Sequence, residues 1–209
     1  IMAKFLLILT LPALLILSTN TSSGEAPPNI ILLYADDLGY TDLSCQGSDY
    51  YQTPNIDRLA KEGMTFTNAY AAAANCAPSR ASLMTGLYTP RHGVFTVGNS
   101  DRGKAAHRRL IPATNKTVLT RTLPTMAQIL KKAGYQTAVA GKWHLSDDPI
   151  PYGFDTNFGG LRWGAPKSYF SPYRNPNLKD GPKGEHLPAR LAQEICSWIT
   201  LAQKKDNPF

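Results

Sequence analysis

The sequence has 209 residues, of which 43% are hydrophobic and 18% are charged. A chain of this size is about one ordinary domain and has enough apolar side chains for a core, which excludes a largely disordered protein. Its formal net charge of +7 favours anionic partners, but it contains no helix-turn-helix, zinc-finger or RNA-binding signature, so we expect no nucleic acid partner.

The N-terminal residues 1–26 have the three-part layout of a secretory signal peptide. One lysine precedes an apolar run over residues 5–17, and small and polar residues follow it. The run is short for a membrane span. We therefore expect residues 1–26 to be a signal peptide, residues 27–209 to be exported to the periplasm or secreted, and no stable membrane association. A single N-terminal anchor is the alternative, because no A-x-A cleavage site is visible.

The first half of the chain alternates between strand and helix signals. A continuous apolar run at residues 30–34 predicts a parallel strand buried on both faces. The expected elements after it are a helix between Thr53 and Gly63, a second strand over residues 64–71, and a helix from about Pro78 to Thr85 that ends at Gly86.

The second half continues the same alternation. A helix ending at Gly134 is expected to bury Met126, Ile129, Leu130 and Ala133. The elements expected after it are a strand over residues 135–145, an ordered Pro/Gly-rich excursion over residues 149–188, and a helix over residues 188–205 with the apolar stripe Leu191, Ile195, Trp198 and Ala202. This order predicts an α/β domain with a mainly parallel sheet.

Ligands of such a sheet bind beyond the carboxyl ends of its strands, and two carboxylates follow the first strand. Asp36 and Asp37 can converge on one cation where the chain bends, and hard carboxylate oxygens suit Ca²⁺ or Mg²⁺. The alternative is a turn that caps the next segment, since the sequence DDLGY has good turn chemistry.

A cysteine stands at the start of a predicted helix. Cys76 would meet free backbone N–H groups and the positive end of the helix dipole there, and Arg80 lies one turn further on. A guanidinium at that place suits sulfate or phosphate oxygens. Helix physics alone leaves open a reactive thiol, a structural cysteine and one half of a disulfide.

Lys142 and His144 lie two residues apart after a predicted strand. In extended geometry their side chains project to the same side. A cation beside a proton carrier fits the handling of an anionic substrate and its leaving group, although either residue alone would be read as a surface residue.

Two further segments suggest ligands. Residues 101–121 hold six of the 22 basic residues and one acid, which predicts either a polyanion-binding segment or a solvated loop. Trp163, Tyr169 and Tyr173 either stack on sugar rings or serve as packing.

The segment CAPSRASLMTG at residues 76–86 matches the sulfatase signature C-x-P-S-R-x-x-L-x-T-G at every specified position. The chain from about Pro28 onward resembles the formylglycine-dependent sulfatases of the alkaline phosphatase superfamily, in particular those that degrade bacterial polysaccharides. The flanking segments NIILLYADDLGYTD and AGYQTAVAGKWHL are similar to the family's metal-binding strand and its Lys/His strand.

The resemblance implies an alkaline phosphatase-like three-layer sandwich and a chemistry for each site residue. Asp36 and Asp37 would bind Ca²⁺ rather than Mg²⁺. Cys76 would be oxidised by a formylglycine-generating or sulfatase-maturing enzyme to formylglycine, whose hydrate also binds the metal and attacks sulfur. Arg80 would stabilise its charge, Lys142 would contact the sulfate, and His144 would assist the hydroxyl that later releases it.

The expected substrate is a sulfated carbohydrate, either a sulfated galactan or a glycosaminoglycan. Modification of Cys76 would leave Cys45 and Cys196 to pair or to remain thiols. His92 is expected to be structural or near the pocket.

The resemblance also predicts that residues 27–209 are the N-terminal portion of a catalytic domain that is incomplete at the C-terminus. No second acidic metal motif follows His144. We therefore expect the 209-residue chain alone to be inactive and poorly stable. The alternatives are a phosphodiester or phosphonate monoester hydrolase of the same superfamily and a non-catalytic fragment that binds sulfated glycans.

Overall fold

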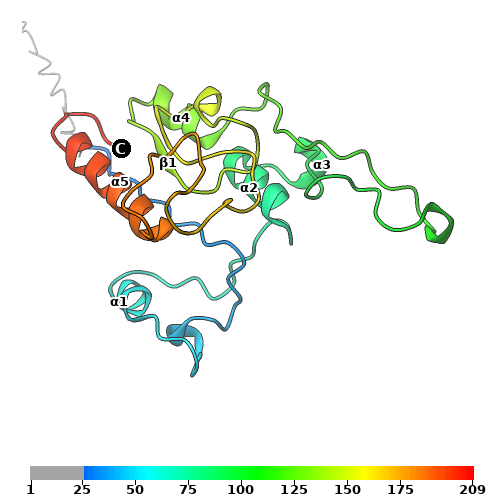
Figure 1. Ribbon diagram of the computed structural model, residues 1–209, viewed down its shortest axis with the longest axis horizontal. Helices are drawn as coiled ribbons and strands as arrows, with labels where there is room; N and C mark the ends of the chain where they lie inside the picture. The colour runs from blue at the N-terminus through cyan, green and yellow to red at the C-terminus, as the bar shows by residue number, and fades with distance from the viewer. Residues whose placement is uncertain (1–25) are drawn as a thin grey trace, which may run out of the picture.

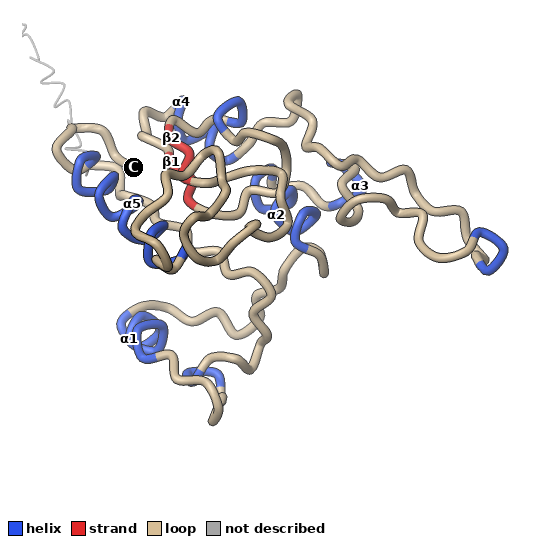
Figure 2. The backbone as a smooth tube through the Cα atoms, in the orientation of Figure 1, coloured by secondary structure: helices blue, strands red, loops and turns tan. Residues whose placement is uncertain are grey.

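The computed structural model describes residues 26–209, so the predicted signal peptide lies almost entirely outside the described residues. Its elements in chain order are η1 (Ser44–Gln46), α1 (Pro54–Glu62), α2 (Cys76–Thr85), α3 (Thr89–His92), η2 (Ala105–His107), α4 (Met126–Lys132), β1 (Ala138–Ala140), η3 (Ile150–Tyr152), β2 (Thr156–Phe158) and α5 (Leu187–Ala202). Loops connect these short elements and make up most of the backbone (Figure 2).

The main body contains α2, α4, α5 and a two-stranded sheet, while η1 and α1 lie apart from it (Figure 1). Strands β1 and β2 are parallel, with Ala138 opposite Thr156 and Ala140 opposite Phe158. The parallel orientation confirms the predicted class of sheet. No described helix is long and apolar enough to cross a membrane.

The larger apolar core joins α2, α4 and the segment after β1. Its largest members include Trp143, Tyr152 and Phe154, whose rings pack edge to face or tilted at centroid separations of 5.4–5.7 Å. Such aromatic pairs stabilise beyond the area that they bury. This core holds α2 in place, because Ala77 and Ala81 of that helix are buried within it.

The Pro/Gly-rich segment at residues 149–188 is ordered, as predicted. It contains η3 and β2, and it forms a second small core with α5 from Tyr173, Leu178 and Leu187. Tyr173 is 1% exposed, and its hydroxyl donates to a Glu185 carboxylate oxygen at 2.7 Å. The suggestion that Tyr173 stacks on sugars is therefore wrong, whereas Tyr169 is 55% exposed.

The predicted strand at residues 30–34 is not formed among the described residues. Its side chains are exposed, with Leu33 at 80%. A strand forms only where neighbouring strands accept and donate its backbone hydrogen bonds. Here Ile30 N–H donates to the Phe209 carbonyl at 2.6 Å, and Gln136 N–H donates to the Pro208 carbonyl at 2.8 Å. Residues 208–209 therefore lie between the 30–34 segment and the start of the β1 region.

Two other strand predictions are wrong in whole or in part. Residues 64–71 are irregular, and only residues 138–140 of the predicted 135–145 strand are extended in the sheet. Strand β1 ends before Gly141, because the φ of 87° at Gly141 is not an extended conformation. Glycine adopts this conformation easily, whereas other residues seldom do.

The helix predictions agree more closely with the structure. Pro54 begins α1 and Gly63 ends it, as predicted, and α2 begins two residues earlier than expected. In the predicted apolar stripe of α5, Ala202 is buried, and Leu191, Ile195 and Trp198 are half-buried. Helix α4 differs, because it buries Ala127 while Ile129 remains 59% exposed.

Candidate active site

Helix α2 places Cys76 at its first position. Asn75 before it is extended, and its side-chain amide donates to Thr96 Oγ1 at 2.9 Å instead of capping the helix. Pro78 fits the first turn, where no intrahelical N–H bond is needed. Cys76 is half-buried, and as a free cysteine it lies beside the unpaired N–H groups and the positive dipole end of α2. The position therefore favours an anion, as predicted.

Arg80 lies one turn along α2 and is fixed on several sides. It is 9% exposed, and its guanidinium carbon lies 5.1 Å from the centre of the Tyr34 ring. One terminal nitrogen donates to the Lys142 carbonyl, and the other contacts Asp36 Oδ1 at 3.3 Å. Its Nε is buried and has no partner among the described residues. A cation–π contact and two polar contacts therefore hold the guanidinium in one orientation.

Asp36 lies between two cations. Lys142 Nζ contacts Asp36 Oδ2 at 2.6 Å, on the opposite oxygen from Arg80. Partial burial raises the pKa of Asp36, but the Lys142 ammonium and the Arg80 guanidinium outweigh it and hold that pKa below its ordinary value. The structure thus brings together Asp36, Arg80 and Lys142, although Asp36 and Lys142 are 106 positions apart in the sequence.

Asp37 has φ 55° and is exposed. The left-handed conformation is one that aspartate tolerates better than most residues. It turns the chain directly after Asp36, so the two carboxylates do not continue a strand. Within residues 26–209 no group of three or more His, Cys, Asp or Glu side chains is arranged to hold a metal ion.

The donors nevertheless fit a calcium ion in kind. Asp36 and Asp37 supply hard carboxylate oxygens, and Ca²⁺ takes six to eight oxygen ligands. Two carboxylates are part of such a set. Among the described residues, these two carboxylates are the ones that could hold such an ion.

His144 departs from the geometry predicted for it. Its φ is 67°, and β1 ends at Ala140, so the expected extended strand through Lys142 and His144 is wrong, although the Lys142 charge still acts on the imidazole. Its backbone N–H donates to the Leu161 carbonyl at 2.8 Å, which ties the turn to the 161–164 loop. A Cβ added to Gly164 would lie 3.1 Å from Cε1 of the imidazole. The loop therefore packs directly on the ring.

The surroundings of the His144 imidazole favour its neutral form. Burial lowers its pKa most, Lys142 and Arg80 lower it further, and Asp36 opposes them. Its Nδ1 is buried and has no partner among the described residues. A neutral imidazole with an unpartnered nitrogen is suited to accept or deliver a proton.

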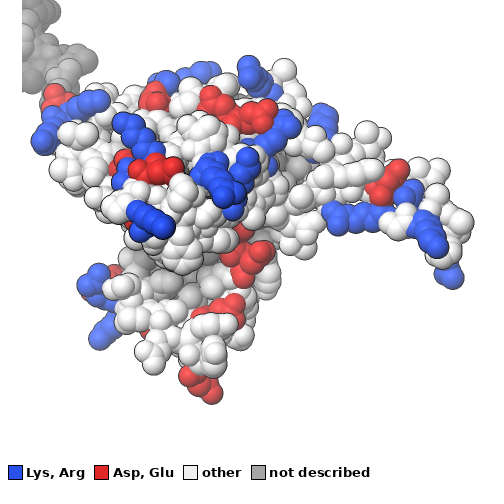
Figure 3. Space-filling model, viewed as in Figure 1, with Lys and Arg blue, Asp and Glu red and all other residues white. Residues whose placement is uncertain are grey.

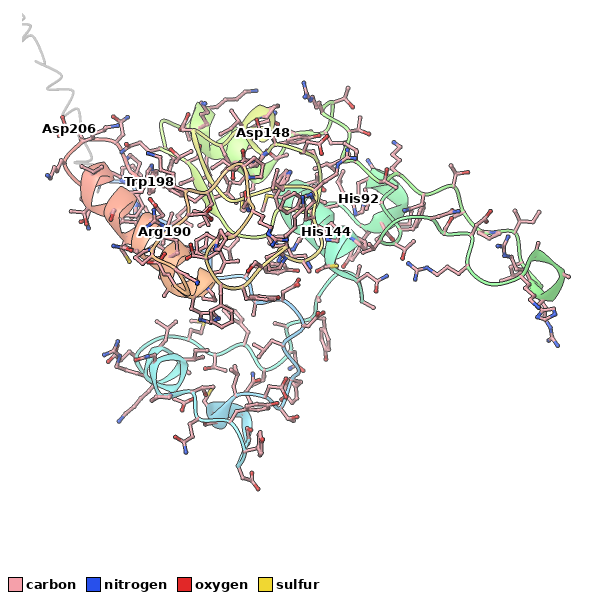
Figure 4. The ribbon with its side chains drawn as sticks, in the orientation of Figure 1. His92, His144, Asp148, Arg190, Trp198 and Asp206 are labelled. Carbon is pink, nitrogen blue, oxygen red and sulfur yellow. The ribbon has the colours of Figure 1, made fainter. Side chains whose placement is uncertain are left out.

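His92 has a structural role. It is fully buried, its Nδ1 accepts the Val94 N–H at 3.1 Å, and its Nε2 lies 3.0 Å from Ser82 Oγ. Both nitrogens are therefore occupied. Figure 4 shows His92 and His144 on the α2 and α3 side of the molecule, away from Trp198 on α5.

A cavity of about 160 Å³ adjoins His144. Its walls come from the start of α2, the segments after α3 and the loop beyond β2, and its lining residues are Ala77, Val94, Thr96, Val97, Gly98, Thr117, His144 and Arg162. The sequence analysis did not identify two residues that contact the site residues. Tyr34 packs its ring against the Arg80 guanidinium, and Gly164 packs against the His144 ring. Tyr34 carried a signal, because it ends an apolar run immediately before the carboxylates.

The three cysteines are free thiols in the described part of the chain. Cys45 and Cys196 are exposed and do not pair. This decides the alternative left open by the sequence in favour of thiols.

Known proteins are similar to this chain in sequence and in fold. N-Acetylgalactosamine-6-sulfatase of Rattus norvegicus is 37% identical over 177 residues, which cover 81% of this chain and 32% of that protein. N-Acetylgalactosamine-6-O-sulfatase of Bacteroides thetaiotaomicron is 42% identical over 130 residues, covering 62% and 23%. The chain thus spans about a third or less of the length of these relatives.

Solved structures agree with the sequence relatives. The crystal structure of Ps i-CgsB in complex with k-i-k-neocarrahexaose has a TM-score of 0.71 and 32% identity, covering 87% of this chain and 43% of that one. A sulfatase structure from Bacteroides fragilis, 22% identical, shares the fold with a TM-score of 0.70. These neighbours have the alkaline phosphatase-like fold, which confirms the predicted fold class for a partial domain. The family model for sulfatases matches residues 28–209, and the chain belongs to the sulfatase family.

Proposed function

We propose that the protein hydrolyses sulfate esters of carbohydrates, with Cys76, converted to formylglycine, as its nucleophile. The observation that carries this proposal is the Arg80, Asp36 and Lys142 cluster beside the start of α2. A sulfate ester is an anion, and hydrolysis places further negative charge on its oxygens. Two fixed cations and a helix N-terminus at one place stabilise that charge.

Each residue has a distinct part in this proposal. The hydrate of formylglycine would have two hydroxyls on one carbon. The oxygen of one would form a bond to sulfur while the S–O bond to the sugar breaks and the sugar leaves as its alcohol. Loss of a proton from the other hydroxyl would form the C=O bond, break the C–O bond to sulfate and release sulfate, which restores the aldehyde. Arg80, oriented by Tyr34, stabilises the charge on the nucleophile. Lys142 contacts the sulfate oxygens. His144, neutral and partly enclosed, removes a proton from the second hydroxyl.

Asp36 and Asp37 would hold Ca²⁺ together with the modified Cys76. The bound ion would supply a positive charge close to the nucleophile. In this proposal the contacts of Asp36 with Arg80 and Lys142 keep its carboxylate ionised and ready for the ion.

The substrate class follows from the relatives. Two curated relatives are named for N-acetylgalactosamine-6-sulfate chemistry, and the structural neighbours include complexes with k-i-k-neocarrahexaose and with D-glucosamine-2-N,6-O-disulfate. We infer a sulfated galactan or glycosaminoglycan as substrate. Export through residues 1–26 and modification by a sulfatase-maturing enzyme complete the proposal.

We propose that the activity needs more residues than positions 26–209 supply. The relatives are about three times longer than the matched segment, and the described metal ligands are two carboxylates. We therefore propose that the 209-residue chain alone does not turn over substrate.

The test is mass spectrometry of the Cys76 peptide after expression with a maturation enzyme. The expected result is an aldehyde in place of the thiol at Cys76, while Cys45, equally free but exposed, remains a thiol. In the full-length protein, Cys76→Ala should abolish sulfatase turnover and Cys45→Ala should retain it. Full sulfatase activity with only thiol at Cys76 would contradict the mechanism. Faster turnover of phosphodiesters than of sulfate esters would contradict the reaction.

A further inference from the structure

An arm made of residues 95–117 protrudes from the main body beyond α3 (Figure 1). Two stretches of chain run out and back, and η2 (Ala105–His107) lies at the tip. The arm carries most of the basic segment that the sequence singled out. None of the roles proposed for the catalytic residues uses it.

Asn115 holds the two sides of the arm together. Its Oδ1 accepts the N–H groups of Phe95 at 2.7 Å and Thr96 at 3.1 Å, and its Nδ2 donates to the carbonyls of Thr96 at 3.0 Å and Gly98 at 2.5 Å. Further out, Ser100 Oγ donates to the Ala113 carbonyl at 2.5 Å. The arm therefore has a defined shape despite its length and exposure.

The basic residues of the tip divide into two kinds. Arg108 is used internally, because its guanidinium donates to the carbonyls of Arg102 and Gly103 and contacts Asp101 at 3.4 Å. Lys104 and Arg109 are exposed, with no ion pair or side-chain hydrogen bond recorded within residues 26–209. Figure 3 shows Lys and Arg side chains along the arm and at its end.

The lone acid of the tip does not balance this charge. Asp101 is the single acidic residue between positions 101 and 121, and it is already paired with Arg108. One terminal nitrogen of Arg102 donates a hydrogen bond to the Val97 carbonyl at 2.8 Å, and the other guanidinium N–H groups remain available to a ligand. The tip thus presents Arg102, Lys104 and Arg109 with donors left for an anion.

The base of the arm reaches the candidate active site. Thr96, Val97, Gly98 and Thr117 line the cavity that also contains His144 and the start of α2. A long molecule bound at the tip could therefore extend along the arm as far as that cavity. A small sulfate ester in the cavity would not reach the tip.

We propose that the arm binds a linear sulfated polysaccharide through Arg102, Lys104 and Arg109 and guides it to the cavity beside His144. The identity of the polymer rests on the proposed function, whereas the attraction of the tip for a polyanion does not. Sulfate groups spaced along a chain suit a row of exposed, unpaired cations. The exposed Leu110 and Ile111 next to this row make a second copy of the chain the competing partner.

The experiment measures binding of dextran sulfate to the full chain carrying Cys76→Ala, which removes hydrolysis from the readout. The arm variant is Lys104→Gln with Arg109→Gln, because within residues 26–209 neither side chain makes an ion pair or a hydrogen bond. The matched control is Lys204→Gln with Lys205→Gln, which lowers the net charge equally at another exposed site. Uncharged dextran of the same length is the control polymer.

The arm variant should bind dextran sulfate roughly 2- to 30-fold more weakly, from two exposed ion pairs of ordinary strength. The control variant should bind like the parent, and added salt should weaken the parent more than the arm variant. Equal weakening in both variants, or binding of uncharged dextran, would overturn the proposal. So would an arm variant that changes sedimentation but not dextran sulfate affinity, because the arm would then join copies of the chain.

The outcome is separate from that of the proposed function. Absence of sulfatase activity in the full-length protein with formylglycine at position 76 would contradict the reaction while leaving the dextran sulfate result unaffected. Loss of arm binding would leave the Cys76 mass-spectrometric test unaffected.

Discussion

Burial lowers the pKa of both His92 and His144, but it does so in different settings. The pKa of His92 is lowered mainly by burial and further by the charge of Lys116. Both ring nitrogens of His92 have hydrogen-bond partners. Because its Nδ1 accepts the Val94 N–H, the proton of the neutral ring lies on Nε2 and points to Ser82. Protonation of Nδ1 would remove the Val94 bond and place a charge in the core.

This arrangement predicts a pH dependence of stability that belongs to His92. Its folded pKa lies below the unfolded value of about 6.5, so the unfolded chain binds more protons. The free energy of unfolding should therefore fall as the pH drops below about 6.5 and continue to fall until the folded pKa is passed. Urea unfolding across this range should show a smaller pH slope in His92→Gln than in the parent. Equal slopes would contradict the assignment, since His144 is present in both proteins.

Gly164 gives a second prediction at the scale of a single residue. Gly164→Ala requires no left-handed backbone, but its methyl group would lie 3.1–3.2 Å from the His144 ring and must displace it by a few tenths of an ångström. We expect a shifted His144 Cε1–H resonance and a free energy of unfolding changed by less than about 1 kcal/mol. Ala165→Ser is the control, because that side chain is exposed. An unmoved His144 resonance in Gly164→Ala would show that the loop does not position the ring.

At the scale of elements, helices were more predictable than strands. The signals for α1 are local, since Pro54 begins it and Gly63 ends it within one short segment. The 30–34 strand depends on partners far along the chain, and only its first residue finds one here, at Phe209. Apolar runs predict that a segment is buried, but the hydrogen bonds that make it a strand come from tertiary structure.

Helix α4 shows how one cap joins an element to the core. Thr125 accepts the Gln128 N–H at 3.2 Å, Gln128 Oε1 accepts the Thr125 N–H at 3.0 Å, and the Thr125 hydroxyl also donates to the Tyr152 carbonyl. The cap is fully buried. It therefore fixes α4 to the segment that carries Tyr152 and Trp143, close to the candidate site.

Thr125→Ala should lower the free energy of unfolding by about 1–3 kcal/mol. The change removes the helix cap and leaves the buried Tyr152 carbonyl without its donor. Thr125→Ser keeps the hydroxyl and should lose less than half as much. Urea denaturation monitored by tryptophan fluorescence measures both, and equal losses in the two variants would assign the effect to the missing methyl group.

At the scale of the whole molecule, the candidate site is assembled from distant segments that the sequence identified one at a time. Asp36, Arg80 and Lys142 were each predicted from local patterns, and the structure joins them by direct contacts. Residue spacing did not reveal three features that depend on how loops pack. These are the contact of the Tyr34 ring with Arg80, the left-handed turn at His144 and the contact of Gly164 with the His144 ring.

The segment at residues 30–34 gives the last prediction. Ile31 is 62% exposed and Leu33 is 80% exposed, next to backbone groups that lack strand partners among the described residues. An exposed apolar segment with unpaired backbone groups is a template for association with another chain. We expect the 209-residue chain to self-associate at micromolar concentration in sedimentation experiments, and Ile31→Lys with Leu33→Lys to reduce that association. Leu110→Lys with Ile111→Lys adds the same charge on the arm and should leave it unchanged. If the arm variant alone dissociates the complex, the association surface is the arm and not the segment at residues 30–34.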